Sequence, residues 1–283
     1  MTDPRPAPDL AERRRAFRRL HESGCFVIPN PWDRGSARFL ESLGFRALAT
    51  TSSGFAWSRA RPDNGMPRDA VLEHLREMVE ATSLPVNADF ESGFAPDPAG
   101  VAESVRLAVG TGIAGVSIED STGDAARPMF PIDDAVARMR AAREAIDRAG
   151  ADVMLVGRAE GFFVGRPDLD ETIARLKAYA SAGADVLYAP GLRTREEIAA
   201  VVEAVAPKPV NLLIGQANGL SVDEVAALGV RRVSVGGALA RCAWGAFASA
   251  ARSIAETGRF DAFAQAASGA ELNRLFRDAP PRG

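Results

Sequence analysis

Residues 41–50 read ESLGFRALAT, and the same arrangement returns as VGTGIAGVSI at 109–118, ASAGADVLYA at 180–189 and AALGVRRVSV at 226–235. In each stretch a helical pattern ends at a glycine, and a short apolar run follows. The glycine stands where a helix needs a left-handed residue after its last turn: Gly44, Gly112, Gly183 and Gly229. The aliphatic and β-branched runs behind these glycines predict strands that are buried on both faces.

The same alternation extends along the chain. Eight strands are predicted, near 26–29, 46–51, 85–89, 115–119, 153–157, 185–189, 209–213 and 232–235. Helices are predicted between them, at 33–43, 69–82, 98–110, 133–148, 168–182, 194–205 and 221–228, and a longer one follows at 237–256. Strict alternation of strand and helix implies a parallel sheet. Eight units in about 250 residues fit a closed (β/α)₈ barrel better than an open sheet. We therefore predict an α/β fold, a TIM barrel.

No linker-like stretch interrupts this pattern, so we predict a single domain over residues 1–283, with the barrel at approximately 24–255. An arginine-rich helix is expected before it, ending near Gly24. The tail 256–283 contains a further helical pattern, FDAFAQAASGAELNRLF. This tail could cap its own barrel or cover a neighbouring subunit, and the sequence favours neither.

Composition limits the class of partner. The net charge is -3, which gives no reason to expect binding to nucleic acid or to an anionic membrane. No apolar run approaches the ~20 residues of a membrane span, and the first residues lack the apolar core of a signal peptide. Cys25 and Cys242 lie far apart and form no disulfide framework. We therefore expect a cytoplasmic protein.

Acidic residues follow two consecutive predicted strands. The third strand runs into VNADFESGF, which carries Asp89 and Glu91, and the fourth ends at Glu119. The active site of a TIM barrel lies at these carboxyl ends of the strands. Carboxylates that converge there repel one another unless a cation or a proton intervenes, and an oxygen-only cluster suits Mg²⁺. We predict a metal site at Asp89, Glu91 and Glu119, with Mn²⁺ as the alternative ion.

Other polar residues near strand ends permit two interpretations. Asp33, Asp120 and Glu160 either belong to the site or cap the helices that follow them. Gly236 and Gly237, in the loop after the eighth strand, either hold an anion at the next helix or only permit tight packing.

The predicted strand ends carry neither histidine nor lysine at the barrel mouth, and this disfavours several kinds of chemistry. The histidines, His21 and His74, fall in predicted helices, so a histidine-bound zinc or a histidine base is not expected, and His74 is expected to be solvated. Lys177 lies in a predicted helix, and Lys208 precedes the seventh strand, at the wrong end of the barrel. A Schiff-base aldolase needs a lysine in the barrel mouth, so this class is not expected.

Four short motifs occur in one order: SSGFA after the second strand, DFESGF after the third, IED after the fourth and GRAE after the fifth. Together they resemble the isocitrate lyase/phosphoenolpyruvate mutase superfamily, and the similarity covers roughly residues 24–255. The resemblance implies Mg²⁺-dependent barrels that bind 2-oxo acids and cleave or form C–C or P–C bonds next to the carbonyl. It also implies a homo-oligomer, usually a dimer of dimers, in which a C-terminal helix is exchanged between neighbours.

Specific roles follow from the resemblance. Ser53, Gly54 and the amide of Phe55 would hold the carboxylate of the substrate. Asp89 would contact Mg²⁺ and the substrate most directly, and Glu91 and Glu119 would act through water. Arg158 would bridge the substrate's oxygens and steady an enolate.

Two further residues complete the predicted site. Asp63, in RARPDNG, matches an acid of the family that reaches the site from the loop after the second strand, although the spacing is shorter here. Asn211, in the seventh strand, is expected to face the barrel mouth and is predicted to bind substrate.

The chain departs from the family pattern in two places. Glu91 stands where an aspartate is usual. The loop after the fourth strand reads STGDAARPMF, without the Lys-Arg-Cys-Gly-His stretch of isocitrate and methylisocitrate lyases and without the lysine and asparagine of phosphonopyruvate enzymes. Arg127, beside Asp124, is the cation available there; it could assist catalysis only as a fixed charge. A standard isocitrate or methylisocitrate lyase is therefore not expected.

The best-fitting function is a Mg²⁺-dependent lyase or hydrolase that cleaves a C–C bond in a small 2-oxo or 2-hydroxy dicarboxylic acid through an enolate. Catalytic roles are predicted for Arg158, Glu119, Asp63 and Arg127. The alternatives are a phosphonopyruvate-type P–C mutase or hydrolase, and a 2-oxo-acid-binding protein without turnover. The loop 121–131 separates these alternatives in principle, and its sequence is ambiguous.

Overall fold

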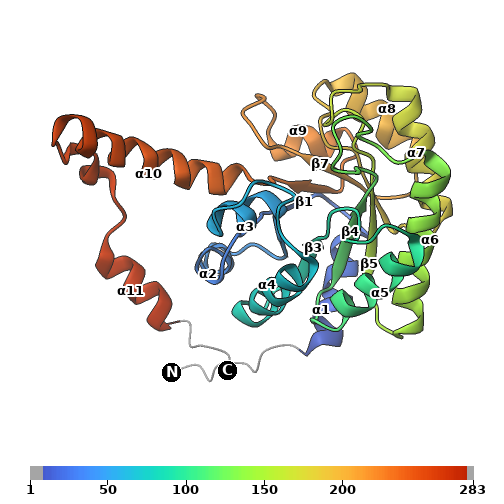
Figure 1. Ribbon diagram of the computed structural model, residues 1–283, viewed down its shortest axis with the longest axis horizontal. Coiled ribbons are helices and arrows are strands. Elements are labelled where there is room, and N and C mark those ends of the chain that lie inside the picture. The colour runs from blue at the N-terminus through green and yellow to red at the C-terminus, as the bar shows by residue number, and fades with distance from the viewer. Residues whose placement is uncertain (1–8, 279–283) are drawn as a thin grey trace.

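The computed structural model describes residues 9–278. Its strands form one parallel sheet in the order β1-β8-β7-β6-β5-β4-β3-β2. Their bounds are β1 Phe26–Ile28, β2 Leu48–Ala49, β3 Val86–Asp89, β4 Gly115–Glu119, β5 Met154–Arg158, β6 Val186–Tyr188, β7 Val210–Leu213 and β8 Arg232–Ser234. The backbone N–H of Ala49 donates to the carbonyl of Pro29 at 3.1 Å and joins the two edges. The sheet is a nearly closed barrel, as Figure 1 shows, so the predicted TIM barrel and its eight strands are confirmed.

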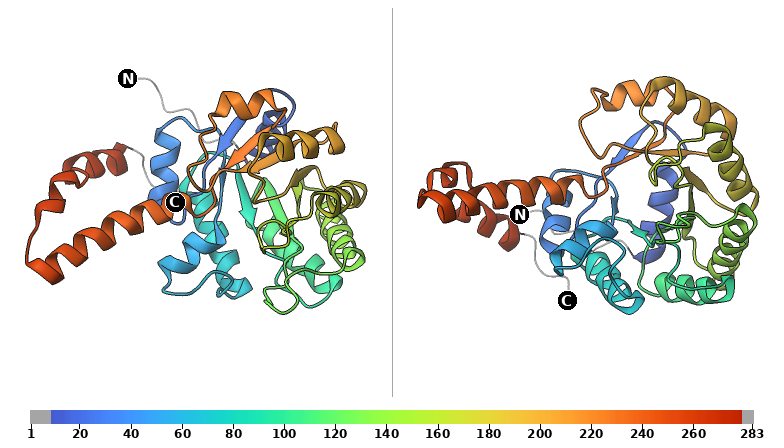
Figure 2. Two further views of the ribbon diagram at one scale, coloured as in Figure 1. Left: turned by 90° about the horizontal axis from the view of Figure 1, so that it is seen from above. Right: turned by 45° about the horizontal axis from the view of Figure 1, so that its top comes forward.

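Helices surround this barrel (Figure 2). They are α1 Leu10–Leu20, α2 Arg34–Ser42, α3 Ser52–Ser58, α4 Arg68–Ala81, α5 Pro98–Val109, α6 Ile132–Arg148, α7 Leu169–Ser181, α8 Arg195–Val205, α9 Val222–Ala227 and α10 Ala238–Thr257, followed by the 3₁₀ helix η1 Asp261–Gln265 and by α11 Gly269–Asp278. Among the described residues, no helix has the length and apolarity needed to cross a membrane.

The repeated glycines adopt the backbone conformation that their position predicts. Their φ angles are +84° at Gly44, +94° at Gly112, +103° at Gly183 and +87° at Gly229. A side chain is strained in this left-handed region, and glycine is not. Each glycine therefore lets a helix end and the chain turn directly into the next buried strand.

Two apolar clusters hold the barrel together. The larger lies between the sheet and the surrounding helices. The smaller fills the barrel interior and includes Phe17 of α1, which is fully buried. Arg14 fixes α1 in place by donating to the carbonyls of Ile113 and Val109, at 2.9 and 3.1 Å. Helix α1 thus covers the amino-terminal end of the barrel, and the free space lies toward the carboxyl ends of the strands.

The short helix α3 is not anticipated by the sequence, which predicts only a loop after β2. Its first turn begins at Thr51, whose side-chain oxygen accepts from the N–H of Gly54 at 3.3 Å. Serine and glycine have low helix propensity, so the segment gives little local signal. Threonine as the capping residue compensates for this and directs the start of α3 to the barrel mouth.

Helix α10 extends away from the barrel as an arm (Figures 1 and 2). Only Ala240 is buried along its length, and Phe247 is 63% exposed. After η1 the chain turns back, and α11 contacts α2. The predicted helix at 237–256 is therefore confirmed, but most of it lies outside the barrel wall instead of packing as an eighth barrel helix.

Candidate active site

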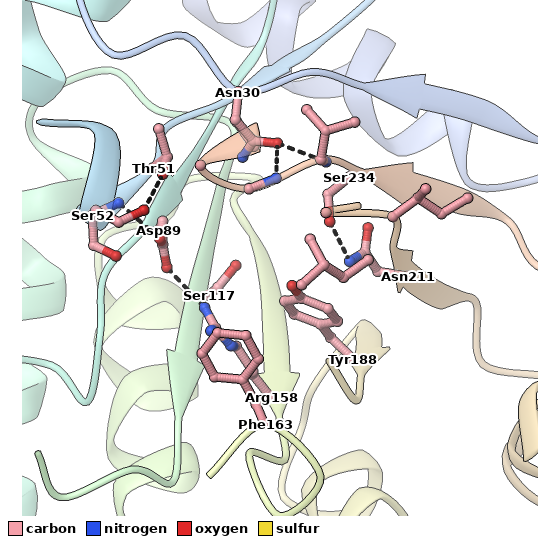
Figure 3. Close-up of a pocket in the computed structure, with 18 of the residues that line it drawn as sticks. Asn30, Thr51, Ser52, Asp89, Ser117, Arg158, Phe163, Tyr188, Asn211 and Ser234 are labelled. Atoms are coloured by element: carbon pink, nitrogen blue, oxygen red, sulfur yellow. Dashed lines mark hydrogen bonds and ion pairs between the residues drawn. The ribbon is translucent and has the colours of Figure 1, made fainter. Parts of the chain in front are cut away.

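A cavity of about 380 Å³ opens at the carboxyl ends of the strands (Figure 3). Each strand, or the residues directly behind it, supplies a polar side chain to the lining. In strand order these are Asn30, Thr51, Asp89, Ser117, Arg158, Tyr188, Asn211 and Ser234. A concave site with convergent polar groups at this end of a TIM barrel is where catalysis is expected.

Arg158 lies among three carboxylates at one side of the cavity. Its Nη1 is 3.1 Å from Asp89 Oδ1 and 3.2 Å from Glu119 Oε2, and its Nε contacts Glu160 Oε1. The guanidinium also lies over the Tyr188 ring, 5.1 Å from its centroid. Burial alone would lower the pKa of Arg158, but Glu160 and Glu119 raise it well above its ordinary value. Arg158 is therefore a fixed, fully charged cation.

Asp89 is fixed on two sides. Its Oδ2 accepts from the backbone N–H of Ser52 at 2.9 Å, at the start of α3, while Oδ1 faces Arg158. Its own N–H donates to Thr50 Oγ1 at 2.9 Å. The unpredicted helix α3 thus orients the carboxylate that ends β3.

Negative charge accumulates beside Asp89. Burial, and then Asp89 and Asp63, raise the pKa of Glu91 to about 8. Asp63, an exposed residue in the loop after α3, lines the same cavity; its pKa is raised by partial loss of water on the cavity side and then by the charge of Asp89. Burial, and then Glu160, Asp89 and Glu91, raise the pKa of Glu119 against the opposing effect of Arg158. Arg158 alone does not neutralise this group of acids.

Glu91 has an unusual backbone as well. Its φ is +48°, in the left-handed region that residues other than glycine rarely occupy. Its carbonyl accepts from the N–H of Glu119 at 3.0 Å, which ties the two acidic loops together. Strain of this kind persists where the surroundings impose it, often at functional sites.

The donor set suits a divalent cation that keeps part of its water shell. Among residues 9–278, no three His, Cys, Asp or Glu side chains converge closely enough to enclose an ion by themselves. Mg²⁺ commonly binds through one or two carboxylates and several waters. An excess of carboxylates with raised pKa values at one edge of a cavity is compatible with that mode.

The residues predicted to hold the substrate carboxylate separate into two groups. Ser53 lines the cavity, whereas Gly54 and Phe55 lie behind it. The amide of Gly54 donates to Thr51 Oγ1, and that of Phe55 to the Thr51 carbonyl at 3.1 Å. A Cβ on Gly54 would be 2.7 Å from Thr51 Cγ2. Close packing therefore accounts for the glycine at this position.

Arg127 lies outside the cavity. Its side chain is 87% exposed and is 3.8 Å from the carboxylate of Asp124. The loop 121–131 folds on itself, with the N–H of Thr122 donating to the carbonyl of Pro128 at 3.0 Å. No described residue of this loop lines the cavity.

The two interpretations of the remaining strand-end residues are now resolved. Asp33 caps α2. Asp120 accepts from Arg175, Tyr179 and the N–H of Glu160, so it links the end of β4 to α7 and to the loop after β5 instead of capping a helix. Glu160 contacts Arg158.

The glycine pair after β8 lies against α3. A Cβ on Gly237 would be 2.7 Å from Ser53 Oγ and 3.2 Å from the Trp57 ring. Tight packing is thus observed at this glycine.

Sequence reasoning missed three of the residues that line the cavity. Trp57 lines it, and so do the missed residues Ser117, Tyr188 and Arg232. The last three lie on strands β4, β6 and β8 with their side chains inside the barrel, and the two-residue period of a strand could have identified them. The expectation for His74 is wrong: it is 3% exposed and stacks on Phe55, with ring centroids 3.8 Å apart.

Residues 17–255 match the family model described as phosphoenolpyruvate phosphomutase. The chain belongs to this family. An uncharacterised protein of Mycobacterium tuberculosis is 31% identical over 85% of this chain and 89% of its own length. The oxaloacetate decarboxylase of Paraburkholderia xenovorans is 28% identical over 78% of this chain and 74% of that enzyme.

Solved structures of related proteins superpose closely on this chain. A candidate lyase or mutase of Burkholderia cenocepacia has a TM-score of 0.93 and 51% identity, covering 97% of this chain and all of that one. Oxaloacetate acetylhydrolase, solved with its product oxalate, has a TM-score of 0.83 and 26% identity, over 95% and 96% of the two chains. For 2,3-dimethylmalate lyase, a member of the phosphoenolpyruvate mutase/isocitrate lyase superfamily, the values are 0.82 and 26%, over 95% of each.

The predicted superfamily is therefore confirmed. The chain is an enzyme of this superfamily, of the carbon–carbon lyase type.

Proposed function

We propose that this enzyme cleaves a C–C bond in a small 2-oxo or 2-hydroxy dicarboxylic acid, as a Mg²⁺-dependent lyase or hydrolase. Relatives support the substrate class, because an oxaloacetate decarboxylase, an oxaloacetate acetylhydrolase and a dimethylmalate lyase are named for acids of this kind. Oxaloacetate-like and substituted malate-like acids are the favoured substrates.

The position of Arg158 is the observation that carries this proposal. Cleavage next to a carbonyl places negative charge on the carbonyl oxygen as an enolate forms. A cation held beforehand by Asp89, Glu119 and Glu160 needs no reorganisation to stabilise that charge. Ser53, at the start of α3 on the cavity wall, is proposed to bind the substrate's carboxylate, and Asn211 to contact its far side.

We propose Asp89 as the residue that would hold Mg²⁺ most directly, with Glu91 and Glu119 acting through water. When bound, Mg²⁺ would supply Lewis-acid polarisation of the carbonyl; Mn²⁺ is the alternative ion. Glu91 and Asp63, whose pKa values are raised, could each hold or pass a proton at the cavity edge. We assign Asp63 a catalytic role on this basis, and Glu119 one because it is buried against Arg158 and burial raises its own pKa.

The loop 121–131 argues against a standard isocitrate or methylisocitrate lyase. It has neither the cysteine nor the histidine of those enzymes, and it lies away from the cavity. Arg127 can contribute only if this loop rearranges toward the mouth. Under this proposal Arg127→Ala lowers kcat without raising KM for the smallest substrates; unchanged kcat would remove Arg127 from the mechanism.

A turnover screen tests the function. Oxaloacetate, 2,3-dimethylmalate, methylisocitrate, isocitrate and phosphonopyruvate would be supplied with Mg²⁺ to the wild-type enzyme and to Asp89→Ala. We expect C–C cleavage of a dicarboxylate that falls at least about 100-fold in the variant, since a removed charge stabiliser typically costs this much. Oxaloacetate also decays without enzyme, so enzyme-free Mg²⁺ samples are the blank.

Two results would contradict the proposal. Turnover of phosphonopyruvate alone would establish the P–C alternative. Tight binding of oxalate without turnover of any acid would indicate a binding protein.

We also propose a homo-oligomer with the tail 256–283 exchanged between subunits, and a single-domain chain. The apolar residues of the α10 arm motivate the exchange, because they are exposed in the single chain. A cytoplasmic location fits the two free cysteines, Cys25 and Cys242.

A further inference from the structure

Arg232, in β8, is a second arginine on the cavity wall. It is 2% exposed, and its side chain lines the cavity together with Asn87, Ser117 and Asn211. These three neighbours come from β3, β4 and β7 and are themselves buried. Arg232 therefore belongs to a polar layer inside the barrel, below the strand ends that carry Asp89 and Arg158.

The partners of Arg232 are all neutral. Its Nε donates to Asn211 Oδ1 at 2.8 Å, and its Nη1 lies 3.5 Å from Asn87 Oδ1 and from His21 Nε2. His21 Nδ1 lies 2.8 Å from the carbonyl of Phe17, which can accept only from an N–H, so Nε2 is left as an acceptor toward Arg232. Burial, and then Arg232, lower the pKa of His21 to about 3. His21 therefore stays neutral beside this cation.

No carboxylate within residues 9–278 forms an ion pair with Arg232. This distinguishes it from Arg158, which has three. Burial lowers the pKa of Arg232 to about 10, so it remains protonated at neutral pH. A buried charge without a counter-charge is unfavourable, and here the uncompensated charge borders the cavity that receives substrate.

We propose that Arg232, held in place by Asn87 and Asn211, forms an anion subsite on the barrel floor that binds the second carboxylate of a dicarboxylate ligand. The inference rests on the proposed function for the identity of the ligand, and extends it to a residue that selects dicarboxylates over monocarboxylates. Arg158 and the acids beside it act at the reacting end. Arg232 acts at the other end, and it gains there the counter-charge that no residue of 9–278 provides.

A matched pair of ligands tests the subsite in the wild-type protein. Malate and 2-hydroxybutanoate have the same chain length and differ in having a carboxylate or a methyl group at the far end. Calorimetric titrations should show malate binding at least about ten-fold tighter, the effect of one charge-assisted hydrogen bond. Equal affinities would overturn the proposal without any mutagenesis. Repeating the titrations with and without sodium chloride shows whether a free anion competes for the same place.

Three variants locate the effect. Arg232→Met keeps the approximate length of the side chain and removes its charge. Malate and 2-hydroxybutanoate should therefore bind this variant with about equal affinity. Arg232→Lys restores the charge but lacks the planar guanidinium that can donate two parallel hydrogen bonds. It should recover part of the preference for malate. Arg76→Gln, at an exposed position on α4 outside the cavity lining, is the control and should keep the preference.

Oxalate is the second probe, because it is short enough to occupy the reacting end alone. Its affinity should be unchanged in Arg232→Met, which also shows that the variant is folded. If malate preference survives in Arg232→Met, or if oxalate binding is lost to the same degree, the subsite is wrong.

The experiments separate this inference from the proposed function. A malate preference that depends on Arg232, in a protein that turns over no acid, would support the subsite and contradict the lyase proposal. Conversely, turnover of a dicarboxylate with the same kcat/KM in wild type and Arg232→Met would support the lyase and overturn the subsite.

Discussion

Arg158 and Arg232 show how the surroundings of one residue type decide its role. Arg158 is surrounded by Asp89, Glu119 and Glu160, so removing it leaves two buried carboxylates and one half-buried carboxylate to repel one another. We expect Arg158→Gln to abolish turnover and to lower the free energy of unfolding by about 3–5 kcal/mol at neutral pH, the usual cost of breaking a buried ion pair. Urea unfolding and steady-state kinetics measure the two effects.

A surface arginine provides the control for that experiment. Arg76 on α4 is exposed, and Arg76→Gln should change the free energy of unfolding by less than about 0.5 kcal/mol. A small loss of stability in Arg158→Gln, similar to that of the control, would mean that the carboxylates do not depend on this cation.

The buried His74 should make the free energy of unfolding depend on pH. Burial, and then Arg59, lower its pKa to about 4 in the folded protein, against about 6.5 when unfolded. Between these values the unfolded chain binds a proton that the folded one does not, so stability falls as the pH falls from 6.5 toward 4. Between pH 7.5 and pH 5.0 this single group should cost about 2 kcal/mol.

The comparison of wild type with His74→Leu isolates that contribution. Urea unfolding at the two pH values should show a loss of stability that is about 2 kcal/mol smaller in the variant. Carboxyls with raised pKa, such as Glu91, act in the opposite direction but are present in both proteins. Equal pH dependence in the two proteins would show that His74 is protonated or solvated in the native state.

At the scale of elements, the start of α3 is held against the turn between β8 and α10. Asn30 contributes by accepting from the N–H groups of Val235 and Gly236, both at 2.9 Å. A Cβ added at Gly237 would collide with Ser53 and approach Trp57. We expect Gly237→Ala to displace Ser53 and raise KM about ten-fold, the loss of one good hydrogen bond to the substrate's carboxylate.

Gly245, within α10, provides a matched glycine control. No atom of the residues that the structure describes lies within 4 Å of a Cβ added there. Gly245→Ala should leave KM unchanged and should stabilise the helix by up to about 1 kcal/mol. If Gly237→Ala also leaves KM unchanged, Ser53 does not bind substrate from the position seen here.

At the scale of the whole molecule, the α10 arm exposes large apolar side chains when the chain is on its own. Trp244 and Phe247 pack edge to face, with ring centroids 5.6 Å apart, yet they are 45% and 63% exposed. Phe260 and Phe263 are exposed beyond them. Several exposed aromatic side chains on one arm often mark an interface, and an exchanged arm between copies of the chain would cover them.

Light scattering after size exclusion tests this assembly. We expect a mass several times the 29.9 kDa of one chain, and a shift to smaller species in Phe247→Asp. Leu43→Asp, at an exposed apolar residue on the barrel, should assemble like the wild type. A wild-type mass of one chain would contradict the proposed exchange.

The barrel itself could be predicted because its signals are local. Each glycine that ends a helix and each buried run that follows is a pattern of a few neighbouring residues, repeated often enough to define strand order. Asp89, Glu91 and Glu119 were recognisable for the same reason, since a strand that ends in acids contrasts with its own apolar sequence.

Other features depend on contacts between distant segments. The sequence places Arg158 at a strand end, but only the closed barrel brings Asp89, Glu119 and Glu160 around it. It shows Arg232 in an apolar run, but only the arrangement of β3, β7 and α1 shows that its partners in the described part of the chain are neutral. Likewise, the sequence pattern predicts the helix α10, but it does not predict that this helix extends away from the barrel. Periodicity determines which elements form, whereas charge pairing, exposure and the shape of the cavity are set by residues that meet only in three dimensions.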